Sequence, residues 1–152
     1  MQVYTDIDRR LHLLCQVLAK TNRTYVGAKA DDSHTNLFYD HNGNIIYGRW
    51  IDTKNGKFVF AMNLHQWSIE CLDESFSTIA TISVEGKKIE ELEINVEQTL
   101  KRLGLNTGSF NNPLHYHIPH YKFLENAFEK PPAKHIEIWE GYRTMANLAC
   151  FY

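Results

Sequence analysis

The sequence lacks the motifs that mark most enzyme families and disulfide scaffolds. It contains no G-x-S-x-G, P-loop, G-x-G-x-x-G or H-E-x-x-H pattern, the signatures of serine hydrolases, nucleotide-binding proteins and zinc proteases. Cys15, Cys71 and Cys150 are odd in number, lie far apart and form no C-x-x-C pair. We expect them to be small buried hydrophobic residues rather than disulfide partners or nucleophiles. These patterns do not decide whether the chain is an enzyme.

Long apolar runs and clusters of like charge are also missing. No stretch approaches the roughly 20 apolar residues of a membrane-spanning helix, and the opening MQVYTDIDRR has neither the basic nor the apolar part of a secretory signal. The formal net charge is only −2, without a cluster of Lys and Arg, which argues against nucleic-acid or membrane binding through bulk charge. We therefore expect a cytoplasmic protein that binds neither nucleic acid nor membranes.

Length and composition favour one domain. The chain has 152 residues, 43% of them hydrophobic and 22% charged, so a single domain over 1–152 is large enough to bury a core. The strongest local signal is in residues 36–64, where two Asn-Gly pairs, at 42–43 and 55–56, are each flanked by aromatic and β-branched residues. This pattern predicts two hairpins and three antiparallel strands.

Further strands and three helices complete the expected fold. Residues 67–72 and 76–84 are typical of two more strands, giving a mostly antiparallel sheet of five or six strands. Apolar residues at helical spacing predict an N-terminal helix over about 6–20, a helix after the strands over 87–103 and a C-terminal helix over about 132–151. The predicted fold class is α+β.

Counting outward from the two tight turns fixes a strand register. Phe38 should face Tyr47 and Thr53 should face Phe58, if each turn has two residues and no bulge intervenes. One sheet face then carries Tyr47 together with Phe60, and a second face carries mostly apolar residues: Leu37, Tyr39, Ile46, Gly48, Trp50, Val59 and Ala61. Because this second face is too apolar for water, a helix, a ligand or a second copy should cover it, and we expect a homodimer through it.

Arg49 is the first candidate for ligand binding. In that register it lies on the aromatic face between Tyr47 and Ile51 and opposite Met62. A guanidinium there would bind a small anionic ligand at a cavity mouth. The alternatives are an arginine at a strand end that reaches water, or a β-bulge that exchanges the two faces.

His115, His117 and His120 form the only dense group of histidines. A His-x-His pair on a strand points both imidazoles to one side, as zinc and iron sites often require, so these three residues are candidate ligands of a divalent metal ion. Strict alternation, however, puts His120 on the opposite face unless Pro119 bends the chain. The simpler interpretation is an edge strand with exposed histidines.

The C-terminal helix offers a second candidate ligand site. Ile138, Tyr142, Met145, Ala146 and Ala149 are expected to form its buried stripe. His135, Trp139 and Arg143 follow at i, i+4 and i+8 on a neighbouring face, where Trp139 could stack on a ligand and Arg143 could pair with an anion. The same trio would also suit an amphipathic rim or a dimer contact.

Three short blocks carry a resemblance to a known family. LHLLCQ at 11–16, RLGL at 102–105 and AKHIEIWEGYR at 133–143 resemble, in order and spacing, a family of uncharacterised bacterial proteins. That family has a helix reading LHLWTQ near its start and a late helix with His and Trp. The resemblance implies only a single-domain architecture, because no activity is established for that family.

Two functions from different classes follow from these observations. The first is a non-enzymatic protein that binds a small ligand or associates with itself, without a cofactor. The second is a metal-dependent hydrolase in which His115, His117 and His120 would hold the metal that activates a water molecule. The absence of catalytic motifs favours the first.

Overall fold

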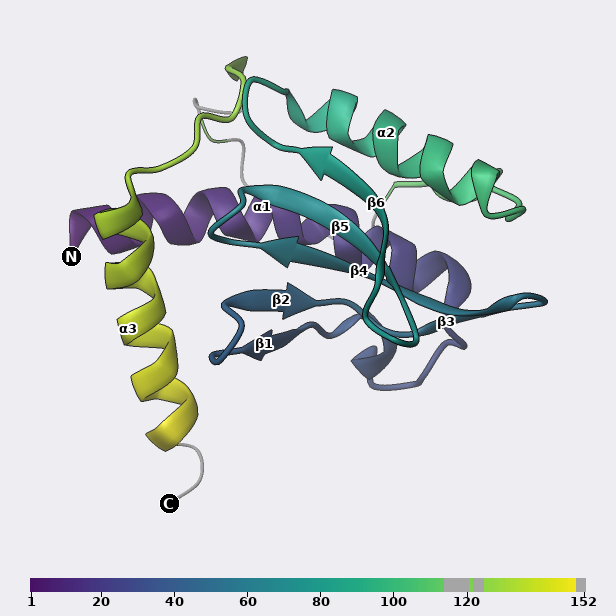
Figure 1. Ribbon diagram of the computed structural model, residues 1–152, viewed down its shortest axis with the longest axis horizontal. Helices are drawn as coiled ribbons and strands as arrows, with labels where there is room; N and C mark the ends of the chain where they lie inside the picture. Colours follow the sequence, from purple (N-terminus) through teal and green to yellow (C-terminus); the bar gives the residue numbers. More distant parts are fainter. Residues whose placement is uncertain (114–120, 122–124, 150–152) are drawn as a thin grey trace.

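In the part of the chain that the structure describes, three α-helices and a six-stranded antiparallel sheet make up the fold, so the predicted α+β class is confirmed. The computed structural model describes residues 1–113, 121 and 125–149. Figure 1 shows the order of the elements along the chain. They are α1 (Gln2–Tyr25), the short 3-10 helix η1 (Ser33–Thr35), β1 (Phe38–Asp40), β2 (Ile45–Tyr47), β3 (Ile51–Thr53), β4 (Gly56–Asn63), β5 (Ser68–Asp73), β6 (Thr78–Ser83), α2 (Ile89–Arg102) and α3 (Ala133–Ala149).

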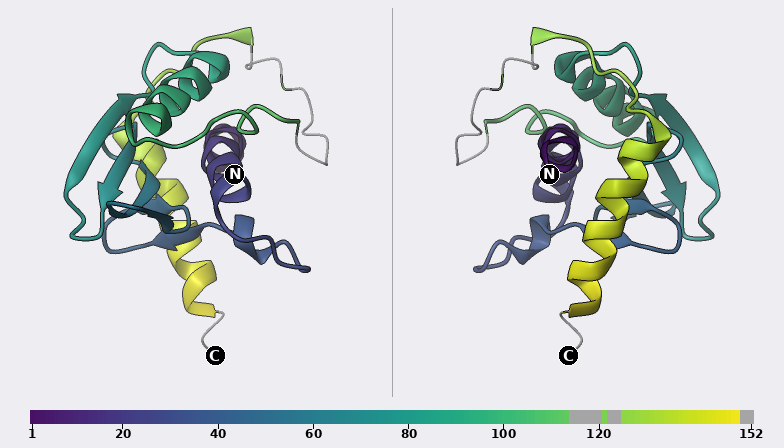
Figure 2. Two further views of the ribbon diagram at one scale, coloured as in Figure 1. Left: turned by 90° about the vertical axis from the view of Figure 1, so that its right-hand side faces the viewer. Right: turned by 90° about the vertical axis from the view of Figure 1, so that its left-hand side faces the viewer.

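The sheet is built around β4. Its strand order is β1-β2-β4-β5-β6, while β3 pairs with β4 beyond the end of β2, on the same edge. Helices α1 and α2 lie on one side of the sheet, and no helix of the described chain covers the other side (Figure 2). The main core fills the space between the sheet and the helices, with Leu14 and Leu18 of α1 and Val96 of α2 fully buried against Phe60 and Met62 of β4.

A one-residue bulge separates β2 from β3. Tyr47 pairs with Ala61 and Ile51 pairs with Phe58, so residues 48–50 on one side oppose only residues 59–60 on the other. An extra residue of this kind interrupts the ladder and turns the following side chains to the other face. The chain from 45 to 53 therefore runs along one side of β4 as a single strand that is interrupted in the middle.

Asn22 of α1 holds this bulge in place. Its side chain is fully buried, and Oδ1 accepts a hydrogen bond from the backbone N–H of Arg49 at 2.9 Å. The neighbouring Gly48 donates its N–H to the carbonyl of Phe60 at 2.8 Å. A Cβ at Gly48 would meet Asn22 Oδ1 at 2.9 Å and the Phe60 carbonyl at 3.0 Å, so only glycine fits between the helix and β4.

Because of the bulge, the side chains of β1 and β2 point to the opposite faces of the sheet from those predicted. Phe38 does pair with Tyr47, as predicted, but Tyr47 packs with Val59 and Ala61 on the second face, whereas Phe60 lies in the main core. Ile46 and Tyr39 instead face the helices. The prediction that Tyr47 and Phe60 share one face was wrong, because it assumed an unbroken register from the first turn to the second.

The second hairpin is also shifted from its predicted register. Thr53 pairs with Gly56 rather than with Phe58, so Lys54 and Asn55 form the turn. The Thr53 hydroxyl donates to the Gly56 carbonyl at 2.8 Å and accepts from the Asn55 N–H at 3.2 Å, which closes the turn one residue earlier than the Asn-Gly rule implies. A shift of two positions leaves the faces of β3 and β4 unchanged.

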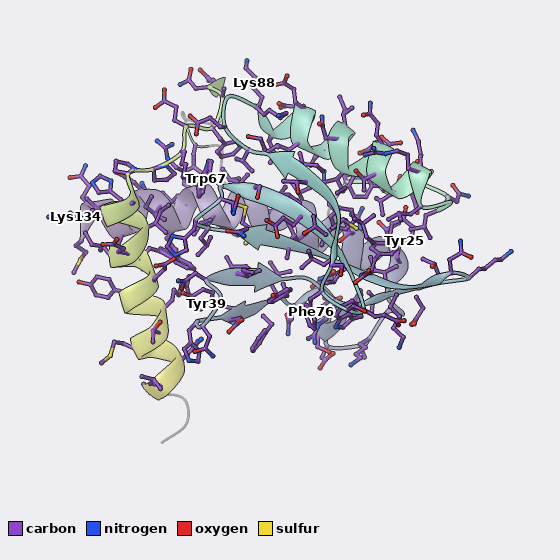
Figure 3. All side chains as sticks on the ribbon, viewed as in Figure 1. Tyr25, Tyr39, Trp67, Phe76, Lys88 and Lys134 are labelled. Carbon is purple, nitrogen blue, oxygen red and sulfur yellow. The ribbon has the colours of Figure 1, made fainter. Side chains whose placement is uncertain are left out.

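In the structure the second sheet face carries Phe38, Tyr47, Trp50, Val59 and Ala61, whereas Leu37, Tyr39 and Ile46, which were predicted there, face the main core. The chain itself covers part of this face. Phe76, in the turn between β5 and β6, packs edge to face on Tyr47 and on Trp50, with ring centroids 6.1 and 5.5 Å apart. Figure 3 shows Phe76 at the tip of that hairpin. Phe38 and Phe76 nevertheless remain 65% and 59% exposed, so this face is still an apolar surface.

The predicted buried stripe of α3 was wrong. Ile136, Trp139 and Glu140 are the buried residues of this helix, whereas Tyr142 and Met145 are exposed. The predicted stripe is an apolar face of α3, but it is not the face that packs on the rest of the domain. That contact is made by the side of the helix that carries Trp139. Among the described residues, no helix is both long and apolar enough to cross a membrane.

Candidate functional site between α1, α3 and the first hairpin

A cavity of about 460 Å³ lies where α1, α3 and the core side of the first hairpin meet. Ligand sites typically have roughly 300 to 1,000 Å³. Helix α3 crosses α1 near the hairpin, as Figure 1 shows. The lining residues come from all three parts: Asp8, Leu11, His12 and Cys15 of α1, Leu37, Tyr39 and Ile46 of the hairpin, and Trp139, Arg143 and Asn147 of α3.

Regular spacing places the helical residues of the cavity on single faces. The residues of α1 follow at i, i+3, i+4 and i+7, and those of α3 follow at i, i+4 and i+8. These separations stack side chains on one side of a helix. The bulge provides the third wall, because it turns Tyr39 and Ile46 toward the helices instead of away from them.

Asp8 is the polar centre of the site. Its Oδ1 accepts hydrogen bonds from the indole Nε1–H of Trp139 at 3.0 Å and from Nη2 of Arg143 at 2.6 Å. Burial by itself would raise the pKa of Asp8, but the hydrogen bonds from Trp139 and Arg143 outweigh it and lower the pKa below its usual value. The carboxylate is thus ionised at neutral pH and ties α3 to α1.

The Arg143 guanidinium has donors left over after it pairs with Asp8. Its Cζ lies 5.3 Å from the centroid of the Trp139 ring, in a cation–π arrangement. Nε is buried, and no partner for it occurs in the part of the chain that the structure describes. A ligand does not reach this buried atom directly, but the Arg143 side chain as a whole lines the cavity and is 43% exposed, so a charged acceptor that enters the cavity would be bound favourably by its outer nitrogens.

Tyr39 lies between the cavity and a cluster of polar residues formed by Asn44, His65 and Glu140. Its ring packs edge to face on Trp139, with centroids 5.3 Å apart, and its hydroxyl donates to Asn44 Oδ1 at 2.9 Å. Asn44 Nδ2 lies 3.0 Å from His65 Nε2, which in turn lies 3.2 Å from Glu140 Oε1. Figure 3 shows Tyr39 on the side of the hairpin that faces α3. Because His65 Nε2 can either accept from Asn44 or donate to Glu140, the link between α3 and the first hairpin rests on the packing of Tyr39 against Trp139.

The buried Glu140 should make stability depend on pH. Burial raises the pKa of its carboxyl above the usual 4.5, although His65 partly offsets this. The folded state therefore binds the proton more tightly than the unfolded state, and stability decreases as pH rises from 4.5 through the folded pKa. We expect Glu140→Gln to equal the wild type near pH 4 and to become more stable relative to it toward about pH 8 in urea unfolding.

Glu90→Gln, at an exposed position of α2, is the matched control for that experiment and should show no such gain. An E140Q protein that loses stability toward neutral pH would mean that the carboxylate, held by His65, stabilises the fold.

The thiol in the cavity is not an activated nucleophile. Burial raises the pKa of the Cys15 thiol to about 12, and the nearby charges of Arg143 and Asp8 act in opposite directions. Because the thiolate is the reactive form, a thiol with this pKa is inert at neutral pH. The cavity thus lacks the activated thiol of a cysteine enzyme.

The structure distributes the candidate ligand-binding residues over three places. Trp139 and Arg143 line the cavity together, but His135 lines a smaller hollow of about 250 Å³ at the start of α3. Arg49 lies at a groove of about 490 Å³ on the second sheet face, and its Nη2 donates to the Ser33 carbonyl at 3.1 Å. The placement of Arg49 on a continuous strand opposite Met62 was wrong, because Arg49 is part of the bulge.

The predicted metal ligands His115, His117 and His120 lie outside the described residues. Within the described ranges, no group of three His, Cys, Asp or Glu side chains is arranged to hold a metal ion.

Sequence reasoning missed Asp8, Tyr39 and Asn147 as members of the site. The helical spacing of Asp8 with Leu11 and Cys15, and of Asn147 with Arg143, was a usable signal. Tyr39 could not be found in this way, since its direction depends on the bulge.

Comparison of the chain with models of protein families, with curated proteins and with solved structures finds no match. The function is therefore inferred from the geometry of the site alone.

Proposed function

We propose that this chain is a non-enzymatic binding protein for a small molecule that carries a carboxylate and a compact apolar body. The observation that carries this proposal is the state of Arg143. Asp8 accepts a hydrogen bond from its Nη2, while the Arg143 side chain lines the cavity and remains 43% exposed there. A carboxylate oxygen is the acceptor that best suits a guanidinium, since hydrogen bonds between two charged groups are the stronger ones.

The position of the Arg143 guanidinium is already fixed before a ligand binds. Asp8 and the Trp139 ring fix it from two sides, so little side-chain entropy remains to be lost when a ligand binds. The hydrogen bonds from Trp139 and Arg143 both go to Asp8 Oδ1, and Tyr4 also hydrogen-bonds to this carboxylate. Asp8 therefore orients Arg143, whose partly exposed side chain can still pair with a ligand.

The other walls of the cavity suit an apolar body. Leu11, Leu37, Ile46 and the rings of Tyr39 and Trp139 line it. An aromatic ring or a short hydrocarbon chain would bury its surface there, while its carboxylate reaches Arg143. This combination of a mostly apolar wall with few polar groups is usual for small-molecule sites.

The test is a titration of the full chain with benzoate, indole-3-acetate and octanoate, each compared with its neutral amide. Binding is followed by the indole N–H signal of Trp139 in proton–nitrogen NMR spectra. At least one acid should shift this signal below about 10 mM and bind about tenfold more tightly than its amide. Arg143→Met should remove that tenfold difference.

Arg49→Met is the matched control, because Arg49 lies at the groove of the second sheet face and away from the cavity. It should leave the affinity for the acids unchanged. The proposal is wrong if no acid shifts the Trp139 signal, or if the two arginine variants weaken binding equally.

Self-association through the second sheet face is the second candidate. The exposed rings of Phe38, Trp50 and Phe76 favour it, because contiguous exposed apolar surface often marks an interface. Phe38→Ser should abolish a dimer that uses this face and leave intact a dimer that uses another one.

A further inference from the structure

Helix α3 has two apolar faces that point in opposite directions. One face, with Ile136 and Trp139, is buried on the body. At 3.6 residues per turn, Ile138, Tyr142 and Met145 lie on the far side of the helix. Figure 1 shows that the C-terminal half of α3 extends beyond α1 and the sheet, and Figure 2 shows the same from the two sides.

The outer face of α3 is contiguous and strongly exposed. Tyr142, Met145 and Leu148 are 57%, 68% and 47% exposed. Single exposed apolar residues are ordinary, but a row of them at helical spacing is typical of a helix that packs against another surface. A helix end without packing is also only marginally stable in water.

A hollow lies beside these protruding side chains. It has about 620 Å³ and is formed by the start of α1 and the outer face of α3, with Met1, Val3, Glu137, Ile138, Gly141, Tyr142 and Met145 as its lining. Apart from its chain neighbours and the backbone of α3 itself, no atom of the described residues lies within 4 Å of the position that a Cβ of Gly141 would take. The surface can therefore receive a large side chain at this point.

We propose that the outer face of α3 binds a second copy of this chain, with the two α3 helices antiparallel. One antiparallel register brings Met145 over Gly141 of the partner subunit and Leu148 over Ile138 of the partner subunit. The protruding side chains and the hollow lie on the same surface of the chain. In a two-fold dimer the side chains of each copy can therefore enter the hollow of the other copy, and every contact occurs twice.

Charge and size also fit a second copy. Glu137 is the one charged residue of the hollow, and depletion of charge is typical of the centre of an interface. The face has far fewer residues than the roughly 20 to 30 per partner of a standard interface, so the dimer should be reversible, with a Kd on the order of micromolar. The ligand cavity lies on the opposite side of α3, and both sites can be occupied together.

Both apolar faces are partly covered within one chain. Phe76 packs on Tyr47 and Trp50 of the sheet face, and Tyr4 of α1 packs edge to face on Tyr142 of α3, with ring centroids 5.1 Å apart. On α3, Met145 has a larger exposed fraction than Phe38 or Phe76.

The proposal is tested by sedimentation velocity of the full chain from about 1 to 100 µM. The wild type should shift from monomer to dimer over this range. Met145→Glu should remain monomeric, because dimerisation would bury an unpaired carboxylate. Leu148→Lys, at a second position of the same face, should also remain monomeric, whereas Met145→Leu and Phe38→Ser should still dimerise.

Unchanged circular dichroism of the two charged variants shows that they fold, as expected for residues with exposed side chains. A wild type that is monomeric at every concentration overturns the proposal. A dimer that Phe38→Ser abolishes and Met145→Glu leaves intact also overturns it, and assigns the interface to the second sheet face.

Discussion

Replacing Asn22 with alanine should lower the free energy of unfolding by about 3 kcal/mol. The substitution removes the acceptor of the Arg49 N–H, which Asn22 Oδ1 binds at 2.9 Å. It also leaves a void beside Gly48, because the Asn22 side chain is fully buried. The higher helix propensity of alanine near the end of α1 offsets only about 0.5 kcal/mol of this loss.

Urea unfolding followed by circular dichroism measures this effect, with Asn112→Ala at an exposed loop position as the matched control. The control should change stability by less than about 0.5 kcal/mol. If Asn22→Ala were equally mild, the side chain of Asn22 would not hold the bulge, and our explanation of the strand register would be wrong.

Trp139→Ala should be the most destabilising change at the site, with a loss of about 4 kcal/mol. Trp139 is 3% exposed, and it donates to Asp8, packs on Tyr39 and lies under the Arg143 guanidinium. Trp139→Phe keeps an aromatic ring and loses the donor to Asp8, so it should cost only about 1 to 2 kcal/mol.

Thermal and urea unfolding of both variants test this ranking, with Trp50→Ala as the control because Trp50 is 38% exposed. The expected order of destabilisation is Trp139→Ala, then Trp139→Phe, then Trp50→Ala. Equal effects of Trp139→Ala and Trp50→Ala would mean that α3 is not docked through Trp139.

The sequence predicted the elements of this fold better than the directions of their side chains. Aromatic and β-branched runs between Asn-Gly pairs predicted the antiparallel strands, and helical periodicity predicted α1, α2 and α3 within a few residues. The bulge could not be predicted in the same way. It depends on the insertion of Asn22, a residue more than 20 positions earlier in the chain, between Gly48 and the strand. Local periodicity contains no information on such a contact.

The candidate site was found only in part for the same reason. Trp139 and Arg143 were recognised because their spacing on one helix is a local property. Their partner Asp8 is 131 positions from Trp139, and Tyr39 joins them only because the bulge reverses the faces of β1 and β2. The predicted buried stripe of α3 shows a related limit, since an apolar face identifies a surface that packs but not what it packs against.

The most direct test of our central claim is the position of a bound acid in the cavity. In NMR spectra of the full chain with the tightest-binding acid of the series, nuclear Overhauser effects should connect ligand protons to the side chains of Tyr39, Ile46 and Trp139. These residues lie together only if the bulge turns the first hairpin toward α1 and α3. Contacts from the ligand to Phe38 and Tyr47 instead would place it on the second sheet face and contradict the proposed site.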